Sequence, residues 1–232
     1  MRKAICYLVT IVFIVTLAGC ISWPDTSTVV IESDIPIDTN NMPLPDPEEL
    51  EFFMTIEEAV VNNDLEDLNS KYIDEVITLF ENNEFAVLFF WNSVNGDAIF
   101  YAMKFMKKEI DGITQYSKPF YTTSIPWNGM HKLSIKRGKL DDIGEIRVSI
   151  TRDVLRLFRI DNTKNFFWGL SQTERVKTLR IEGQLVTEVI EIELNGEIAY
   201  FWYFEDLQTD KKPVFKDLRT YTEGEFIITM DE

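Results

Sequence analysis

The sequence predicts an α+β fold that is predominantly antiparallel β, built of hairpins and a meander, with one or two short helices near the amino terminus. Short runs rich in β-branched and aromatic residues recur along the chain, and Asn-Gly pairs at Asn95-Gly96 and Asn195-Gly196 separate some of them. The stretch that begins at Thr55 combines a helix-starting signal with apolar residues at helical spacing.

The first nineteen residues have the layout of an export signal. Arg2 and Lys3 form a basic start, an apolar run covers residues 4–16, and the small residues Ala18 and Gly19 precede Cys20. The apolar run is about 13 residues long, whereas a membrane-spanning helix needs about 20 residues. Residues 1–19 are therefore interpreted as a cleaved leader rather than a transmembrane helix.

The end of this leader, Leu17-Ala18-Gly19-Cys20, resembles the lipobox of bacterial lipoproteins at every position. The resemblance covers the leader alone, and the alternative is an ordinary secretory peptide that ends in Cys. It implies cleavage before Cys20, a diacylglycerol on the Cys20 sulfur, and a protein held at the extracytoplasmic side of the cell membrane. Each buried CH₂ of an acyl chain contributes about 0.8 kcal/mol, so two or three chains anchor a protein durably.

Residues 20–54 are predicted to be a tether that leads away from the lipid. Five of the eight prolines lie there, among Asp, Ser, Thr and Asn. Proline removes backbone donors and favours extended conformations. The layout of lipobox, tether and β-rich remainder resembles uncharacterised lipoproteins of Gram-positive bacteria, a likeness from which no functional residue can be carried over.

The composition restricts the classes of partner that the mature chain can bind. Cleavage removes two of the 23 basic residues and none of the 39 acidic ones, which leaves a formal charge of −18. Such a surface repels nucleic acid and anionic headgroups, so the lipid remains the expected link to the membrane. Because Cys6 leaves with the leader and Cys20 carries lipid, no disulfide is available, and the fold depends on its hydrophobic core.

The rest of the chain is divided into two β-rich units, residues 55–139 with the short helix and residues 140–232, with one continuous domain as the alternative. In the capping box at 55–58, Thr55 accepts from the amide of Glu58, and Glu58 accepts from that of Thr55. The helix then continues to about Asn62. Its apolar stripe consists of Ile56, Ala59 and Val60.

Strands are expected in both units. Residues 72–80 have partly helical spacing but favour a strand that ends at an Asn82-Asn83 turn. The other strands expected in the first unit are 85–91, 97–105 and 113–121, and those of the second are 146–150, 154–160, 166–170, 176–181, 185–194, 198–204, 214–221 and 226–230. Residues 94–101 resemble residues 194–201 around a shared Asn-Gly turn, through either duplication or chance.

No catalytic motif, metal site or cofactor site is evident. The single histidine, His131, is expected in a loop, and zinc hydrolysis and cysteine catalysis are excluded by the lack of ligands and of a free thiol. The sequence contains no G-x-S-x-G elbow, calcium loop or phosphate cradle. Carboxylate chemistry has many candidates, among them Glu188, Glu191 and Glu193, which are interpreted as the wet side of a sheet.

Runs of adjacent aromatic residues are the main indication of a binding surface. They occur at 89–91, 166–168 and 200–204, where alternate residues of a strand point to opposite faces. Either a second layer covers the outer face, or an exposed aromatic strip binds a protein, peptide or glycan. On the second interpretation Trp202 is a binding residue, and Trp202→Ala weakens ligand capture without unfolding the domain.

The sequence therefore predicts a lipid-anchored, non-catalytic protein that binds or scaffolds an envelope protein or glycan. The alternatives are a carboxylate-dependent envelope hydrolase and an accessory subunit of an envelope complex.

Overall fold

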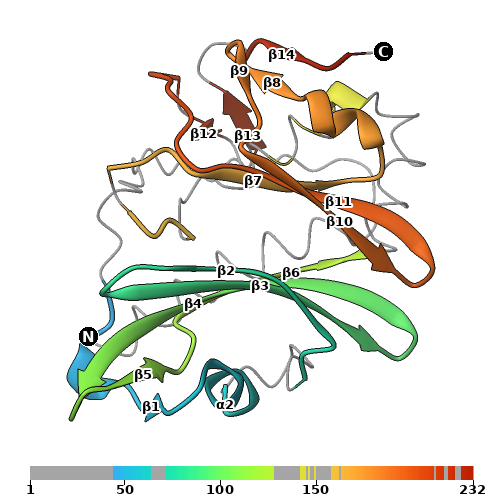
Figure 1. Ribbon diagram of the computed structural model, residues 1–232. Coiled ribbons are helices and arrows are strands. Elements are labelled where there is room, and N and C mark those ends of the chain that lie inside the picture. Colours follow the sequence, from blue (N-terminus) through green and yellow to red (C-terminus); the bar gives the residue numbers. More distant parts are fainter. Residues whose placement is uncertain are drawn as a thin grey trace, which may run out of the picture. The chain divides into compact units, whose positions relative to one another are not determined.

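The computed structural model describes residues 44–63, 72–127, 142–144, 146, 149, 158–161, 163–211, 213–216, 219–222 and 226–231 (Figure 1). Every strand pair among them is antiparallel, so the prediction of a predominantly antiparallel β fold is confirmed. The described residues all belong to one compact unit, Asp38–Glu232. The boundary expected between residues 139 and 140 lies outside the described residues.

The described chain begins with short elements. A 3₁₀ turn η1 (Pro47–Glu49) leads to strand β1 (Phe52–Phe53) and helix α2 (Ile56–Val61). The Thr55 hydroxyl accepts from the Glu58 amide at 3.2 Å as expected, while the Glu58 carboxylate accepts from the Met54 amide instead of that of Thr55. Because β1 pairs with a later strand, the sheet includes residues that the sequence assigned to the tether.

The first sheet has the strand order β1-β5-β4-β3-β2, and β6 also pairs with β4. Its remaining strands are β2 (Glu75–Glu81), β3 (Phe85–Val94), β4 (Asp97–Ile110), β5 (Ile113–Ser117) and β6 (Tyr121–Pro126). The single strand expected over 113–121 is instead the two strands β5 and β6, which pair with different parts of β4. Pro119 lies in the break, where its missing N–H cannot join a ladder.

Turn chemistry shapes the hairpins as predicted. Both residues of each Asn-Gly pair have positive φ, 54° and 84° at Asn95-Gly96 and 53° and 78° at Asn195-Gly196, as a type I′ turn requires. Residues 75–81 form a strand, and Asn82 closes the turn after it by donating its amide to the Phe85 carbonyl at 3.0 Å.

The second sheet has the order β10-β11-β7 and consists of β7 (Phe167–Ser171), β10 (Glu188–Leu194) and β11 (Glu197–Phe204). The smaller elements around it are η3 (Glu174–Thr178), β8 (Arg180–Ile181), β9 (Gln184–Leu185), β12 (Pro213–Lys216), β13 (Arg219–Thr222) and β14 (Ile228–Thr229).

Several strand predictions in this half are wrong in whole or in part. Residues 176–181 begin in η3, because the Thr173 side chain caps a 3₁₀ turn, and 214–221 form a hairpin of two strands. Ile146 and Ser149 are helical rather than extended. Ile143 and Ile146 reach the same core at a spacing of three residues, which is a helical spacing. Of residues 154–160, the described part, 158–160, is not a strand.

Each sheet packs on both of its faces. Helix α2 packs on one face of the first sheet. The core between them contains Ile56, Ala59, Val60, Leu88, Phe90 and Tyr101. The outer face of the second sheet packs on η3, β8 and the carboxyl-terminal strand through a core that contains Phe167, Val176, Ile181, Trp202 and Ile228.

Aromatic rings fill the space between the two sheets. The ring centroid of Phe89 lies 4.9 Å from that of Phe201 and 5.1 Å from that of Trp168. Phe80 on β2 lies 4.9 Å from Tyr203 on β11. The two halves of the chain therefore share one aromatic core.

The two Asn-Gly hairpins also touch at their tips. The side chain of Asn195 donates to the carbonyl of Gly96 at 3.0 Å, and Trp127 donates its indole N–H to Glu197 at 2.9 Å. The similarity between residues 94–101 and 194–201 thus corresponds to two hairpins that face each other. Each hairpin pairs its second strand with a further strand, β6 with β4 and β7 with β11, while among the described strands only the first hairpin pairs its first strand, β3, with another, β2. Their duplication therefore stays a hypothesis.

Candidate functional site

The exposed aromatic strip predicted around Trp202 is wrong. The Trp202 side chain is 0% exposed and lies in the core between the second sheet and the elements beyond it. Apart from the partly exposed Trp91, the aromatic residues of β3, β7 and β11 lie on two covered faces, as the alternative interpretation expected. Trp202→Ala would remove a buried side chain and destabilise the fold, so it does not test ligand capture.

A depression of about 230 Å³ opens where β2 ends, close to the second sheet. Its lining comes from three segments distant in sequence: β2 with its turn, residues 160–166, and the residue after β11. The lining residues are Phe80, Glu81, Asn82, Ile160, Asp161, Lys164, Phe166 and Glu205. The depression therefore exists only when the two sheets are packed together.

Aromatic residues form the apolar part of the depression. The rings of Phe80 and Phe166 meet edge to face at 5.2 Å, and Phe166 also lies 6.0 Å from Tyr203. Asn82 donates its side-chain amide to the Ile160 carbonyl at 2.9 Å, which joins the β2 turn to the second lining segment.

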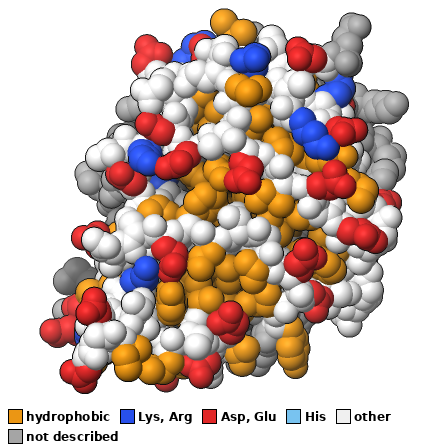
Figure 2. Space-filling model, viewed as in Figure 1, with side chains coloured by type: hydrophobic (Ala, Val, Ile, Leu, Met, Phe, Trp, Pro, Cys, Tyr) orange, Lys and Arg blue, Asp and Glu red, His pale blue; other side chains and the backbone are white. Residues whose placement is uncertain are grey.

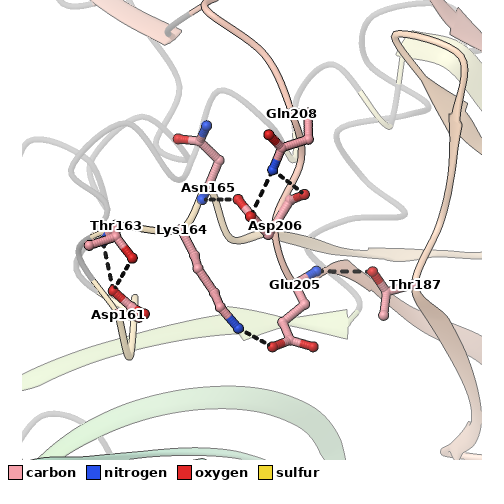
Figure 3. A network of polar contacts seen from close by, with 8 residues as sticks. All are labelled: Asp161, Thr163, Lys164, Asn165, Thr187, Glu205, Asp206 and Gln208. Carbon is pink, nitrogen blue, oxygen red and sulfur yellow. Dashed lines mark hydrogen bonds and ion pairs between the residues drawn. The ribbon is translucent and has the colours of Figure 1, made fainter.

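The polar side of the depression is a network of contacts (Figure 3). Lys164 extends to Glu205, with 2.5 Å between Nζ and Oε1, and the amide of Asn165 donates to Asp206 at 2.9 Å. Asp161 accepts from both the amide and the hydroxyl of Thr163, at 2.7 and 2.6 Å. These contacts hold two of the charged side chains in place.

Two of the charged groups at the depression, those of Asp161 and Lys164, are stabilised in their ionised forms. The hydrogen bonds from Thr163 lower the pKa of Asp161, and the bond to Glu205 raises the pKa of Lys164. A catalytic general acid needs the opposite shift, a carboxyl pKa raised towards neutral pH. Asp161 is therefore suited to attract a cation rather than to donate a proton.

Thr163→Ala is expected to raise the pKa of Asp161 towards its ordinary value, because it removes the hydroxyl donor and leaves only the amide. An NMR titration of the side-chain carboxyl carbons measures the shift. Thr187→Ala is the matched control: the Thr187 hydroxyl accepts from the Glu205 amide, so the pKa of Asp161 should stay as in the wild type. An unchanged Asp161 pKa in Thr163→Ala contradicts this account of the depression.

The second notable surface is the edge of the first sheet. Among the described strands, β2 pairs only with β3, so no described strand covers its other edge. Val76 is 47% exposed and Leu79 is 38% exposed on this strand, which contains neither lysine nor proline. Figure 2 shows hydrophobic side chains gathered on the face of the molecule where β2 lies in Figure 1. Phe80 and Glu81 continue from this edge into the depression.

The other residues singled out in the sequence do not gather at this site. Glu188 accepts from the Tyr203 hydroxyl at 2.5 Å and Glu191 pairs with Lys177 at 3.5 Å, as expected of the wet side of a sheet. Cys20 and His131 lie outside the described residues. The described residues contain no group of three or more His, Cys, Asp or Glu side chains placed to hold a metal ion.

The described part of the chain contains no helix of the length and hydropathy needed to span a membrane. Comparison with protein-family models, with curated proteins and with solved structures finds no match.

Proposed function

We propose that this chain is a lipid-anchored protein on the extracytoplasmic side of the cell membrane, and that its α+β domain binds an envelope protein without catalysis. The anchor is supported by the match of Leu17-Ala18-Gly19-Cys20 to a lipobox. Because the mature chain is strongly acidic, lipid on Cys20 rather than protein charge would hold it at an anionic membrane.

The proposal that the domain binds another protein depends on the edge of β2 that no described strand covers. Edge strands of monomeric proteins are usually short or protected by lysine, proline or a covering segment, since their free backbone groups attract other strands. β2 has seven residues with the centre Val-Ile-Thr-Leu-Phe, and although its register with β3 shifts between Val76 and Thr78, its pairing from Thr78 to Glu81 is regular. An edge of this kind, with exposed Val76 and Leu79, is typical of a surface that another chain covers.

A protein partner suits this surface better than a glycan. The exposed apolar side chains of β2 are the aliphatic Val76 and Leu79, which present no aromatic face to a sugar ring. An accessory role in an envelope complex is one form of this binding function. A carboxylate-dependent hydrolase has less support, because the pKa of Asp161 is shifted away from the range of a general acid.

The anchor is tested by changing Cys20. Wild-type protein should sediment with membranes, and Cys20→Ala should be released into the soluble extracytoplasmic fraction, because no acyl chain can be attached. Cys6→Ala is the matched control and should remain in the membrane fraction, since Cys6 lies inside the leader. Protease added to intact cells should digest the wild-type domain. A membrane-bound Cys20→Ala protein, or a wild-type domain protected inside the cell, contradicts the proposal.

A further inference from the structure

We propose that β2 accepts an additional antiparallel strand from a partner protein, with an apolar residue opposite Leu79 and a basic residue opposite Phe80 that enters the acidic depression. This inference rests on the proposed binding function and names the kind of segment that is bound.

The backbone of β2 offers free groups at the positions such a strand needs. The Asn82 amide bonds to the Phe85 carbonyl, and hydrogen-bonded residues alternate along an antiparallel pair. The N–H and C=O groups of Leu79 and Glu81 therefore point away from β3. Strand addition to a sheet edge uses this kind of row of outward donors and acceptors.

Neighbouring residues of the added strand would meet different surroundings, because they would lie on opposite faces of the sheet. Leu79 is opposite Leu88 and lies on the α2 face, while Phe80 is opposite Val87 and lies on the face towards the second sheet. Residues opposite each other on adjacent strands share a face. The partner residue opposite Leu79 therefore meets exposed apolar surface, and the one opposite Phe80 points to the depression.

The charges that line the depression favour a basic residue of the partner strand at this position. Its lining contains the carboxylates of Glu81, Asp161 and Glu205 and one ammonium group, that of Lys164. Lys107 also pairs with Glu81 at 3.2 Å, and the carboxylates still outnumber the ammonium groups. The rings of Phe80 and Phe166 add surfaces to which a cation is attracted. An acidic partner residue would be repelled here.

A second copy of the same chain fits this edge poorly. Antiparallel pairing of β2 with itself would bring Glu75 at one end of each strand towards Glu81 of the other copy, twice in the dimer, and the register shift between Val76 and Thr78 would interrupt the ladder. Like charges directly opposite each other destabilise a strand pair. The charge of the whole chain acts in the same direction. The edge is therefore better matched to a basic partner.

The test uses full-length mature protein in detergent and a fluorescent hexapeptide, Thr-Lys-Val-Thr-Val-Thr, acetylated and amidated at its ends. When its Lys is opposite Phe80, the following Val is opposite Leu79. A second peptide has Glu in place of Lys. Fluorescence anisotropy should show binding of the Lys peptide at least about tenfold tighter than that of the Glu peptide. Equal affinities, or no binding of the Lys peptide, overturn the inference.

Variants locate the binding to the edge. Leu79→Lys should weaken binding of the Lys peptide at least about tenfold, because it places a charge where the apolar partner residue lies. Ile198→Lys, which changes a residue 44% exposed on the other sheet, should bind as the wild type does. Leu79→Pro removes a backbone N–H that points away from β3 and is not used in pairing with it. This variant should also abolish binding, while its near-UV circular dichroism spectrum stays native. Unchanged binding by both Leu79 variants overturns the inference.

A further pair of variants tests the depression. Glu205→Gln should reduce the preference for Lys over Glu several-fold, while Glu174→Gln should leave it unchanged. Both carboxylates pair with a lysine, but only Glu205 lines the depression. An unchanged preference in Glu205→Gln contradicts the assignment of the basic residue to this depression.

Two other outcomes separate this inference from the proposed function. A wild-type dimer in sedimentation that Leu79→Lys dissociates would assign the edge to a second copy and overturn the inference. A surface protein crosslinked equally to wild type and Leu79→Lys in intact cells would leave the binding function standing and overturn only the strand addition. A domain found inside the cell would refute the proposed function whatever the peptides do.

Discussion

Gly169→Ala is expected to destabilise the domain by about 3 kcal/mol, because the added methyl group has no space. A Cβ at this position would lie 2.5 Å from Cζ2 of Trp202 and 2.6 Å from Cβ of Ser149. Gly169 is opposite Trp202 in the ladder between β7 and β11, so the indole ring lies over the glycine. Trp202 is fully buried and cannot move away without displacing the core around it.

Urea denaturation followed by tryptophan fluorescence measures this loss. Gly183→Ala is the control: Gly183 has φ 76° and no atom near the added methyl, so only backbone strain of about 1 kcal/mol is expected. If Gly169→Ala is as stable as Gly183→Ala, the close packing of Trp202 on β7 is incorrect.

Phe89→Ala should cost about 3–5 kcal/mol, since it empties the centre of the core between the two sheets. The Phe89 side chain is 0% exposed, and its ring lies near those of Phe100, Trp168 and Phe201. Because these rings come from both sheets, the two sheets should unfold in one transition, in wild type and variant alike.

The same denaturation, followed by far-UV and near-UV circular dichroism, checks this expectation. Leu185→Ala changes a half-exposed apolar residue and should alter the free energy of unfolding by less than about 0.5 kcal/mol. Two separate transitions in the wild type, or a Phe89→Ala variant of wild-type stability, would show that the aromatic core does not join the sheets.

Local chemistry made part of this fold predictable. The Asn-Gly pairs adopt the positive φ angles that type I′ turns require, and Thr55 caps α2 through a bond to a residue three positions away. These features depend on a few adjacent residues. The hairpins that contain them therefore appear in the sequence without knowledge of the remaining structure.

Tertiary packing decided the features that the sequence did not reveal. Adjacent aromatic residues such as Phe201 and Trp202 can face solvent or a second layer, and the strand pattern is the same in both cases. Only the packed structure buries them. The depression was also missed, because Glu81, Asp161 and Glu205 are far apart in sequence and each alone looks like a solvated surface residue. The one local indication was the Asn82-Asn83 turn.

The proposed lipid on Cys20 would hold the β2 edge and its acidic depression on the extracytoplasmic side of the membrane. Mass spectrometry of the full-length protein extracted from membranes tests this anchor most directly. A mature chain that begins at Cys20 and carries the added mass of its acyl chains is the expected result. A chain that retains Met1, or one that begins at Cys20 without lipid, would contradict it.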